Sequence, residues 1–236
     1  MAPRWPPRPS DDAESGHTGP VTTAAAELVL RPWLRGTFHR MTVPIAITLT
    51  VIAAVAARSG GARAAVIIYG VCVTAMFLTS GVYHARRLAH RSRSVLRRLD
   101  HSMILVAISG SYTPVIVLAL DGATRVVMLV LCWVIAVVGV AVRMWWMDAP
   151  KPVIALVYLG AGWQMLLALP AYLRGLTPLE MALTAVGGVL YTLGALIFSL
   201  GRPNPWPRIA GYHEVFHLFV VVAFTVQWFA VYSLVS

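Results

Sequence analysis

The apolar residues of this chain form long continuous runs rather than an alternating pattern. An α-helix needs about 17–25 residues to cross the hydrocarbon core of a bilayer. Seven runs without Asp, Glu, Lys or Arg have about that length, at 41–57, 64–85, 102–120, 126–142, 152–173, 181–201 and 215–236. The pattern predicts seven transmembrane helices, and we expect Pro114 and Pro170 to kink the two that contain them. It does not favour a β-barrel, whose strands alternate apolar and polar residues.

The composition supports a membrane protein. Hydrophobic residues make up 58% of the chain and charged residues 12%, whereas soluble domains average about 45–50% and about 25%. These values exclude a soluble globular domain, and they exclude disorder for most of the chain. Only two cysteines are present, Cys72 and Cys132, and both fall inside apolar runs. We interpret them as small apolar side chains, which excludes a secreted disulfide scaffold.

The sequence divides into three segments. Residues 1–26 are rich in Pro, Arg, Asp and Ser and have no apolar period, so we expect a disordered cytoplasmic tail. Residues 27–40 form a cytoplasmic juxtamembrane segment, and residues 41–236 form the seven-helix transmembrane domain. The first long apolar run begins only at Met41, so we expect no cleavable signal peptide.

The net charge of +10 is distributed unevenly over the loops. Fifteen of the 19 Lys and Arg residues fall on one set of alternate loops, and the other set holds Arg58, Arg63, Arg125 and Arg174. The positive-inside rule therefore predicts a multi-pass protein of the cell membrane, with its N-terminus in the cytoplasm and its C-terminus outside. Topology and anionic headgroups also explain the arginine cluster at 86–98. We expect membrane lipids as partners, and no nucleic acid.

Polar residues, most of them ionisable, gather at one predicted depth, on the cytoplasmic side. They lie at the end of the second run and at the starts of the third and seventh runs: Ser80 and His84, Asp100 and His101, then His213, Glu214 and His217. Ionisable residues within a bilayer are costly and usually functional. Because this group comes from three different helices at matching depth, it is the candidate functional site.

The spacing of these residues fits metal binding. His213 and His217 are four residues apart and share one helix face. A third histidine from another helix, for which His84 is the natural choice, would complete a zinc site with an open position for water. Asp100 or Ser80 could hold that water or orient a ligand histidine.

Two other interpretations remain open. A histidine near a membrane interface often faces headgroups or is simply hydrogen-bonded. The segment from His213 to His217 also matches the H-E-x-x-H motif of metalloproteases, in which the Glu is the general base. No His, Asp, Glu or Cys follows His217, which does not fit the usual protease order, but Glu214 stays a rival to Asp100 as a base. We interpret His17, His39 and His90 as surface residues.

Distinctive motifs stand in four places along the chain. They are Ser80-Gly81-Val82-Tyr83-His84, Leu99-Asp100-His101 followed by Gly110-Ser111-Tyr112-Thr113-Pro114, Pro203-Asn204-Pro205-Trp206-Pro207 before Gly211-Tyr212-His213-Glu214-Val215-Phe216-His217, and Arg31-Pro32-Trp33-Leu34-Arg35-Gly36 with His39. Together these motifs resemble the hemolysin III proteins, the bacterial branch of the progestin and adiponectin receptor superfamily, and the resemblance covers residues 27–236.

The resemblance implies a seven-helix bundle with a cytoplasmic N-terminus and a Zn²⁺ ion near the cytoplasmic face. By motif, the ligands are His84, His213 and His217, with Asp100 close to the metal's water and Ser80 near the site. Eukaryotic relatives are receptors with proposed ceramidase activity, and the bacterial branch is associated with membrane homeostasis. Three functions follow: a zinc-dependent hydrolase of a lipid amide or ester, a non-catalytic protein with structural zinc, or a pore-forming cytolysin.

Overall fold

The computed structural model describes residues 32–84 and 90–236. The predicted tail over residues 1–26 and the arginines Arg86 and Arg87 lie outside the described residues. Within them the structure is helical without strands, and seven helices are long and apolar enough to cross a membrane. The predicted all-α, seven-span fold is therefore confirmed. Its orientation across the membrane stays a prediction from the arginine distribution.

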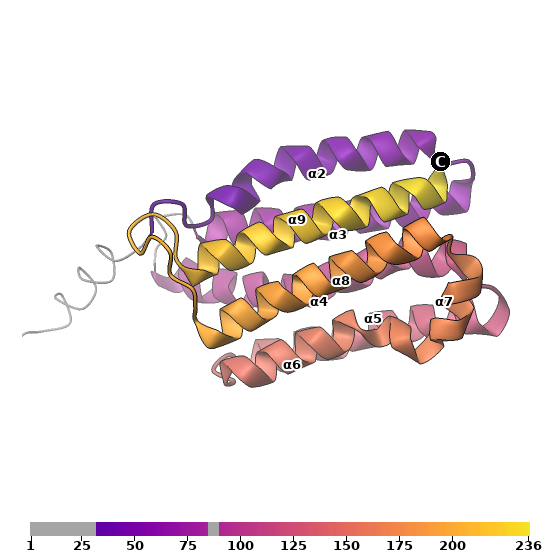
Figure 1. The fold of residues 1–236 in the computed structure, drawn as a ribbon. Coiled ribbons are helices and arrows are strands. Elements are labelled where there is room, and N and C mark those ends of the chain that lie inside the picture. Colours follow the sequence, from indigo (N-terminus) through magenta and orange to yellow (C-terminus); the bar gives the residue numbers. More distant parts are fainter. Residues whose placement is uncertain (1–31, 85–89) are drawn as a thin grey trace, which may run out of the picture. The chain divides into compact units, whose positions relative to one another are not determined.

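Six of the spans are single helices, arranged as an antiparallel bundle (Figure 1). They are α2 (Thr37–Ala56), α3 (Gly60–Tyr83), α4 (His90–Ala119), α5 (Gly122–Trp145), α8 (Pro178–Leu200) and α9 (Tyr212–Val235). The bundle has two ends. We call the end at which α3 finishes and α9 starts the histidine end, after His84 and His213. We call the opposite end, at which α8 starts, the Glu180 end.

The fifth span is broken into three pieces. It consists of α6 (Lys151–Gly162), the 3₁₀ segment η1 (Gln164–Ala168) and α7 (Leu169–Gly175). Pro170 stands in the first turn of α7, where a missing N–H leaves no helical hydrogen bond unmade. The sequence predicted a kink at this proline. The structure instead changes helix type just before it, from α-helix to 3₁₀ helix and back. In contrast, α4 continues through Pro114 as one helix.

Helix α4 starts well before its apolar run. Arg93, Arg97 and Arg98 were expected in a loop, but they lie on this helix. Arginine is a good helix former. The helix can therefore begin several residues before the apolar run, with turns that carry polar side chains. The Arg98 guanidinium donates a hydrogen bond to the Met144 carbonyl, which ties the start of α4 to the end of α5.

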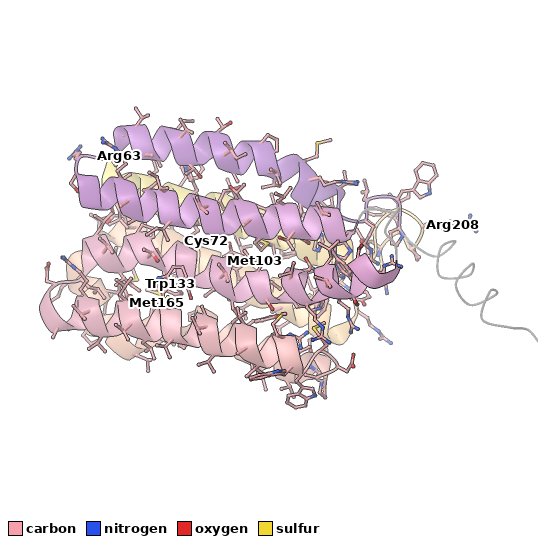
Figure 2. All side chains as sticks on the ribbon, turned by 180° about the vertical axis from the view of Figure 1, so that it is seen from behind. Arg63, Cys72, Met103, Trp133, Met165 and Arg208 are labelled. Carbon is pink, nitrogen blue, oxygen red and sulfur yellow. The ribbon has the colours of Figure 1, made fainter. Side chains whose placement is uncertain are left out.

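The interior of the bundle is built from large apolar side chains such as Phe77 and Phe224, whose rings meet edge to face 5.3 Å apart. Helices α2 and α5 instead leave valines such as Val55 and Val137 exposed, as expected for surfaces that face lipid. Figure 2 places Arg63 and Arg208 at opposite ends of the bundle, with more nitrogen-bearing side chains near Arg208. The ends therefore differ chemically.

Candidate metal centre

Three histidines from two helices converge at the histidine end. His84 directly follows α3, and His213 and His217 lie one turn apart at the start of α9. Their ligand nitrogens all lie within 4.8 Å of one another, and Nε2 of His84 is 3.1 Å from Nε2 of His213. A tetrahedral zinc ion with bonds of about 2.1 Å separates its nitrogen ligands by roughly 3.4 Å. This group of histidines can therefore hold a metal ion after small side-chain adjustments.

The position of His84 depends on the end of α3 and on the segment before α2. Its backbone N–H donates to the Ser80 carbonyl at 3.0 Å, which closes the last turn of α3. Gly36, the N-cap of α2, has a φ of 73°, in the left-handed region that favours glycine. A Cβ atom at Gly36 would lie 2.5 Å from the His84 Cβ. A side chain at Gly36 would therefore displace His84.

The start of α9 is fixed by two side-chain caps. The Glu214 carboxylate accepts a hydrogen bond from the Gly211 N–H at 2.8 Å, and the Asn204 side-chain oxygen accepts one from the Tyr212 N–H at 2.9 Å. These acceptors satisfy N–H groups that a helix start leaves unpaired. Because Asn204 belongs to the proline-rich loop before α9, that loop helps to position His213 and His217.

Glu214 also forms an ion pair, in which its Oε1 lies 2.8 Å from Nε of Arg35. The carboxylate is thus held by a helix cap on one oxygen and by a cation on the other. Its side chain is fully buried and does not line the cavity described below. This arrangement favours a structural role for Glu214 over the role of general base.

Asp100 projects from α4 toward the same group of histidines. Its Oδ2 lies 3.9 Å from Nε2 of His84 and 4.0 Å from Nδ1 of His101. The Ser80 side chain is buried, interacts with the Asp100 carboxylate and lines the same cavity. The structure therefore brings together the five residues that the sequence analysis assigned to the site: His84, His213 and His217, with Asp100 and Ser80 beside them.

His39 is buried in this group, and its interpretation as a surface residue was wrong. Its ring stacks on the His217 ring, with centroids 3.8 Å apart and planes at 10°, and meets the Phe77 ring edge to face at 5.0 Å. Both ring nitrogens of His39 are buried without a hydrogen-bond partner among the described residues.

The error at His39 has a simple cause. The residue stands between Arg35 and Arg40, before the first charge-free run, so its neighbours suggested exposure. However, α2 already begins at Thr37, and the chain before it pairs with the loop before α9 through Trp33 N–H and Leu34 N–H. The buried positions of α2 are His39, Thr42, Ala46 and Ala53. These positions are spaced as one face of a helix. Extending that face back to residue 39 would have predicted that His39 is buried.

A cavity of about 230 Å³ extends from the histidines into the bundle. Near the histidine end its wall includes Asp100 and His217, and elsewhere it includes Thr184 and Gln227. Most of the other lining side chains are apolar, among them Met76, Ile104, Ile108, Leu159, Phe216 and Val220. Such a wall suits the apolar part of a lipid.

Comparison with known proteins gives consistent matches. Residues 28–228 match the family described as "Haemolysin-III related". The chain is 28% identical to the "Hemolysin-3 homolog" of Bacillus subtilis over 70% of this chain and 74% of that protein. It is 27% identical to "Hemolysin-3" of Bacillus cereus over 82% and 86%, respectively. It is also 28% identical to the human "Monocyte to macrophage differentiation factor" over 70% and 68%. No solved structure matches the chain.

Proposed function

Because this chain belongs to the Haemolysin-III related family of integral membrane proteins, we propose that it is a zinc-dependent hydrolase acting in membrane homeostasis. Its substrate would be the amide or ester bond of a membrane lipid. The observation that carries the proposal is a group of three histidines beside one carboxylate, of which His213, His217 and Asp100 line a largely apolar cavity. A zinc ion, when bound, would act as a Lewis acid and make water nucleophilic near neutral pH.

Each residue has a distinct task in this proposal. His84, His213 and His217 hold the metal, and Ser80 orients the Asp100 carboxylate. Asp100 takes a proton from the attacking water and returns it to the leaving amine or alcohol as the carbon–nitrogen or carbon–oxygen bond breaks. Water is thereby added across the bond, and no external oxidant or reductant is needed. The apolar wall of the cavity holds the acyl chain.

A second function is favoured by the origin of the three histidines. They come from the end of α3 and the start of α9, so a metal ion would join two segments that are far apart in the sequence. A purely structural zinc clamp needs the histidines but not Asp100. The largely apolar wall of the cavity gives no comparable support to a pore, whose lumen needs polar groups along several helices.

Asp100→Asn separates hydrolase from clamp. The measurement is turnover of zinc-loaded protein on a panel of lipid amides and esters that includes ceramide, together with zinc content. We expect Asp100→Asn to keep zinc and to lose turnover by about 10²–10⁴-fold. The matched control is Asp148→Asn, which removes the charge of an exposed carboxylate and should leave turnover unchanged.

His84→Ala should lose both zinc and turnover. Wild-type turnover in Asp100→Asn would refute the catalytic role of the carboxylate. The absence of turnover by zinc-loaded wild type across the panel would count against the hydrolase. If cellular function then survives in Asp100→Asn but not in His84→Ala, the clamp is the better account.

A further inference from the structure

The cavity carries a second set of polar groups, away from the histidines. Thr184 of α8 and Gln227 of α9 both line it, and both residues are buried. The Thr184 hydroxyl has no hydrogen-bond partner among the described residues. The Gln227 side chain approaches Gly187, at which a Cβ would lie 3.1 Å from the Gln227 Oε1. Glycine at this position therefore leaves room for the amide.

Thr184 differs from other threonines in the membrane-spanning helices. Five of those donate their hydroxyl to a carbonyl four residues earlier in the same helix: Thr42, Thr50, Thr113, Thr192 and Thr225. This bond is the usual way to satisfy a hydroxyl inside a bilayer. Leaving a buried hydroxyl unpaired costs free energy that a bonded hydroxyl does not. The unpaired hydroxyl of Thr184 on the cavity wall therefore indicates a site for a polar ligand group.

The distance along α9 relates this polar pair to the metal centre. His217 and Gln227 are ten residues apart, which corresponds to roughly 15 Å along the helix axis. Val220 and Phe216 are among the side chains that line the cavity near this stretch. A lipid whose carbonyl lies at the histidines could therefore place the middle of its acyl chain beside Thr184 and Gln227.

We propose that the cavity selects acyl chains that carry a hydroxyl group in mid-chain. Thr184 and Gln227 would exchange hydrogen bonds with that hydroxyl, while the carbonyl lies at the histidines. This inference rests on the proposed function, because it names the substrate class of the same site. An unsubstituted chain would leave Thr184 unpaired, which makes the site discriminate against it.

The test measures binding rather than turnover. Purified protein in nanodiscs is titrated with stearic acid, a stearic acid hydroxylated in mid-chain, and the isomer hydroxylated next to the carboxyl, in competition with a fluorescent fatty acid. We expect the mid-chain isomer to bind about three- to tenfold more tightly than the other two acids, the gain of one net hydrogen bond. The primary amide of the same hydroxylated chain, tested in parallel, shows whether the substrate form is bound as well as the product form.

Variants assign the preference to the polar pair. Thr184→Val and Gln227→Leu should each bring the ratio of affinities close to one, whereas Thr184→Ser, which keeps the hydroxyl, should retain it. The matched control is Thr225→Val, which removes a hydroxyl that is bonded to Val221 and does not line the cavity.

Equal affinity for the three acids in the wild type would overturn the proposal and indicate that an ordered water alone occupies the polar pair. A preference that survives both Thr184→Val and Gln227→Leu would overturn it as well. Because binding requires no turnover, a clear preference in a protein without hydrolase activity would refute the hydrolase while supporting the chain selectivity.

Discussion

Glu180 at one end of the bundle is buried and Asp100 at the other end is partly buried, but the two carboxylates have different surroundings. At the Glu180 end, Glu180 completes a capping box with Thr177: one carboxylate oxygen accepts the Thr177 N–H at 2.8 Å, and Thr177 caps the start of α8 in return. The other oxygen accepts the Ser233 hydroxyl at 3.0 Å. At the histidine end, Asp100 lies within α4 and caps no helix. Its carboxylate faces Ser80, His84 and His101.

The comparison shows that burial alone does not identify a functional carboxylate. Glu214 lies at the histidine end, yet it resembles Glu180, because it caps a helix start and its second oxygen is held by Arg35. When both oxygens of a carboxylate already contact a backbone N–H group or a cation, the carboxylate has a structural role. Asp100 differs because its surroundings are candidate metal ligands and a hydroxyl. This contrast can be tested by substitutions at each end.

The largest effect is expected from removing a ligand. His217→Ala should reduce zinc content from near one ion per chain to almost none, because two histidines do not make a stable zinc site. Elemental analysis of purified protein measures this. The control is His101→Ala, which changes a histidine on the cavity wall outside the group of three. Full zinc occupancy in His217→Ala would contradict the ligand assignment.

The next largest effect concerns stability without metal loss. Glu214→Gln leaves Arg35 without its ion pair, and we expect the free energy of unfolding to fall by about 3 kcal/mol while zinc content is kept. Thermal unfolding in detergent and elemental analysis measure the two quantities. Asp148→Asn serves as the control, since it breaks only an exposed pair with Arg97, for which little change is expected. Loss of zinc from a folded Glu214→Gln protein would show that this glutamate belongs to the site.

A smaller effect is expected at His39. His39→Ala removes the ring that stacks on His217, and such aromatic contacts contribute roughly 0.5–1.5 kcal/mol. Zinc affinity, measured by competition with a chelator, should therefore fall by about two- to tenfold. His39→Phe keeps a ring in place and should restore most of that affinity. If Phe is as poor as Ala, the imidazole nitrogens of His39 contribute, and stacking is not its main role.

The smallest effect is expected at the Glu180 end. Ser233→Ala removes one hydrogen bond from Glu180, and because Ser233 is exposed the cost should be about 0.5 kcal/mol. Zinc affinity should not change. Denaturation and chelator competition on the same sample measure both quantities, and a change in zinc affinity would show that the two ends are coupled.

Much of the fold could be predicted from the sequence because the thickness of a bilayer constrains each span separately. Seven runs of spanning length gave seven spans, and the four-residue spacing of His213 and His217 placed both on one helix face. A kink in the fifth span was predicted at Pro170, but the change of helix type before this proline was not, since the apolar run continues through Trp163 and Gln164 without a charge. Helix type inside such a run depends on packing, as where Gln164 donates to the Cys132 sulfur.

The sequence by itself determined which residues can cross a membrane and which polar side chains share a depth, because both follow from local hydrophobicity and helical spacing. Only the tertiary structure decided which of those side chains have partners. It buried His39 against His217, paired Glu214 with Arg35, and left the Thr184 hydroxyl on the cavity wall without a partner among the described residues. The physical reason is that these hydrogen bonds and ring contacts join segments that are distant in the chain. A local sequence pattern does not show which distant segments come into contact.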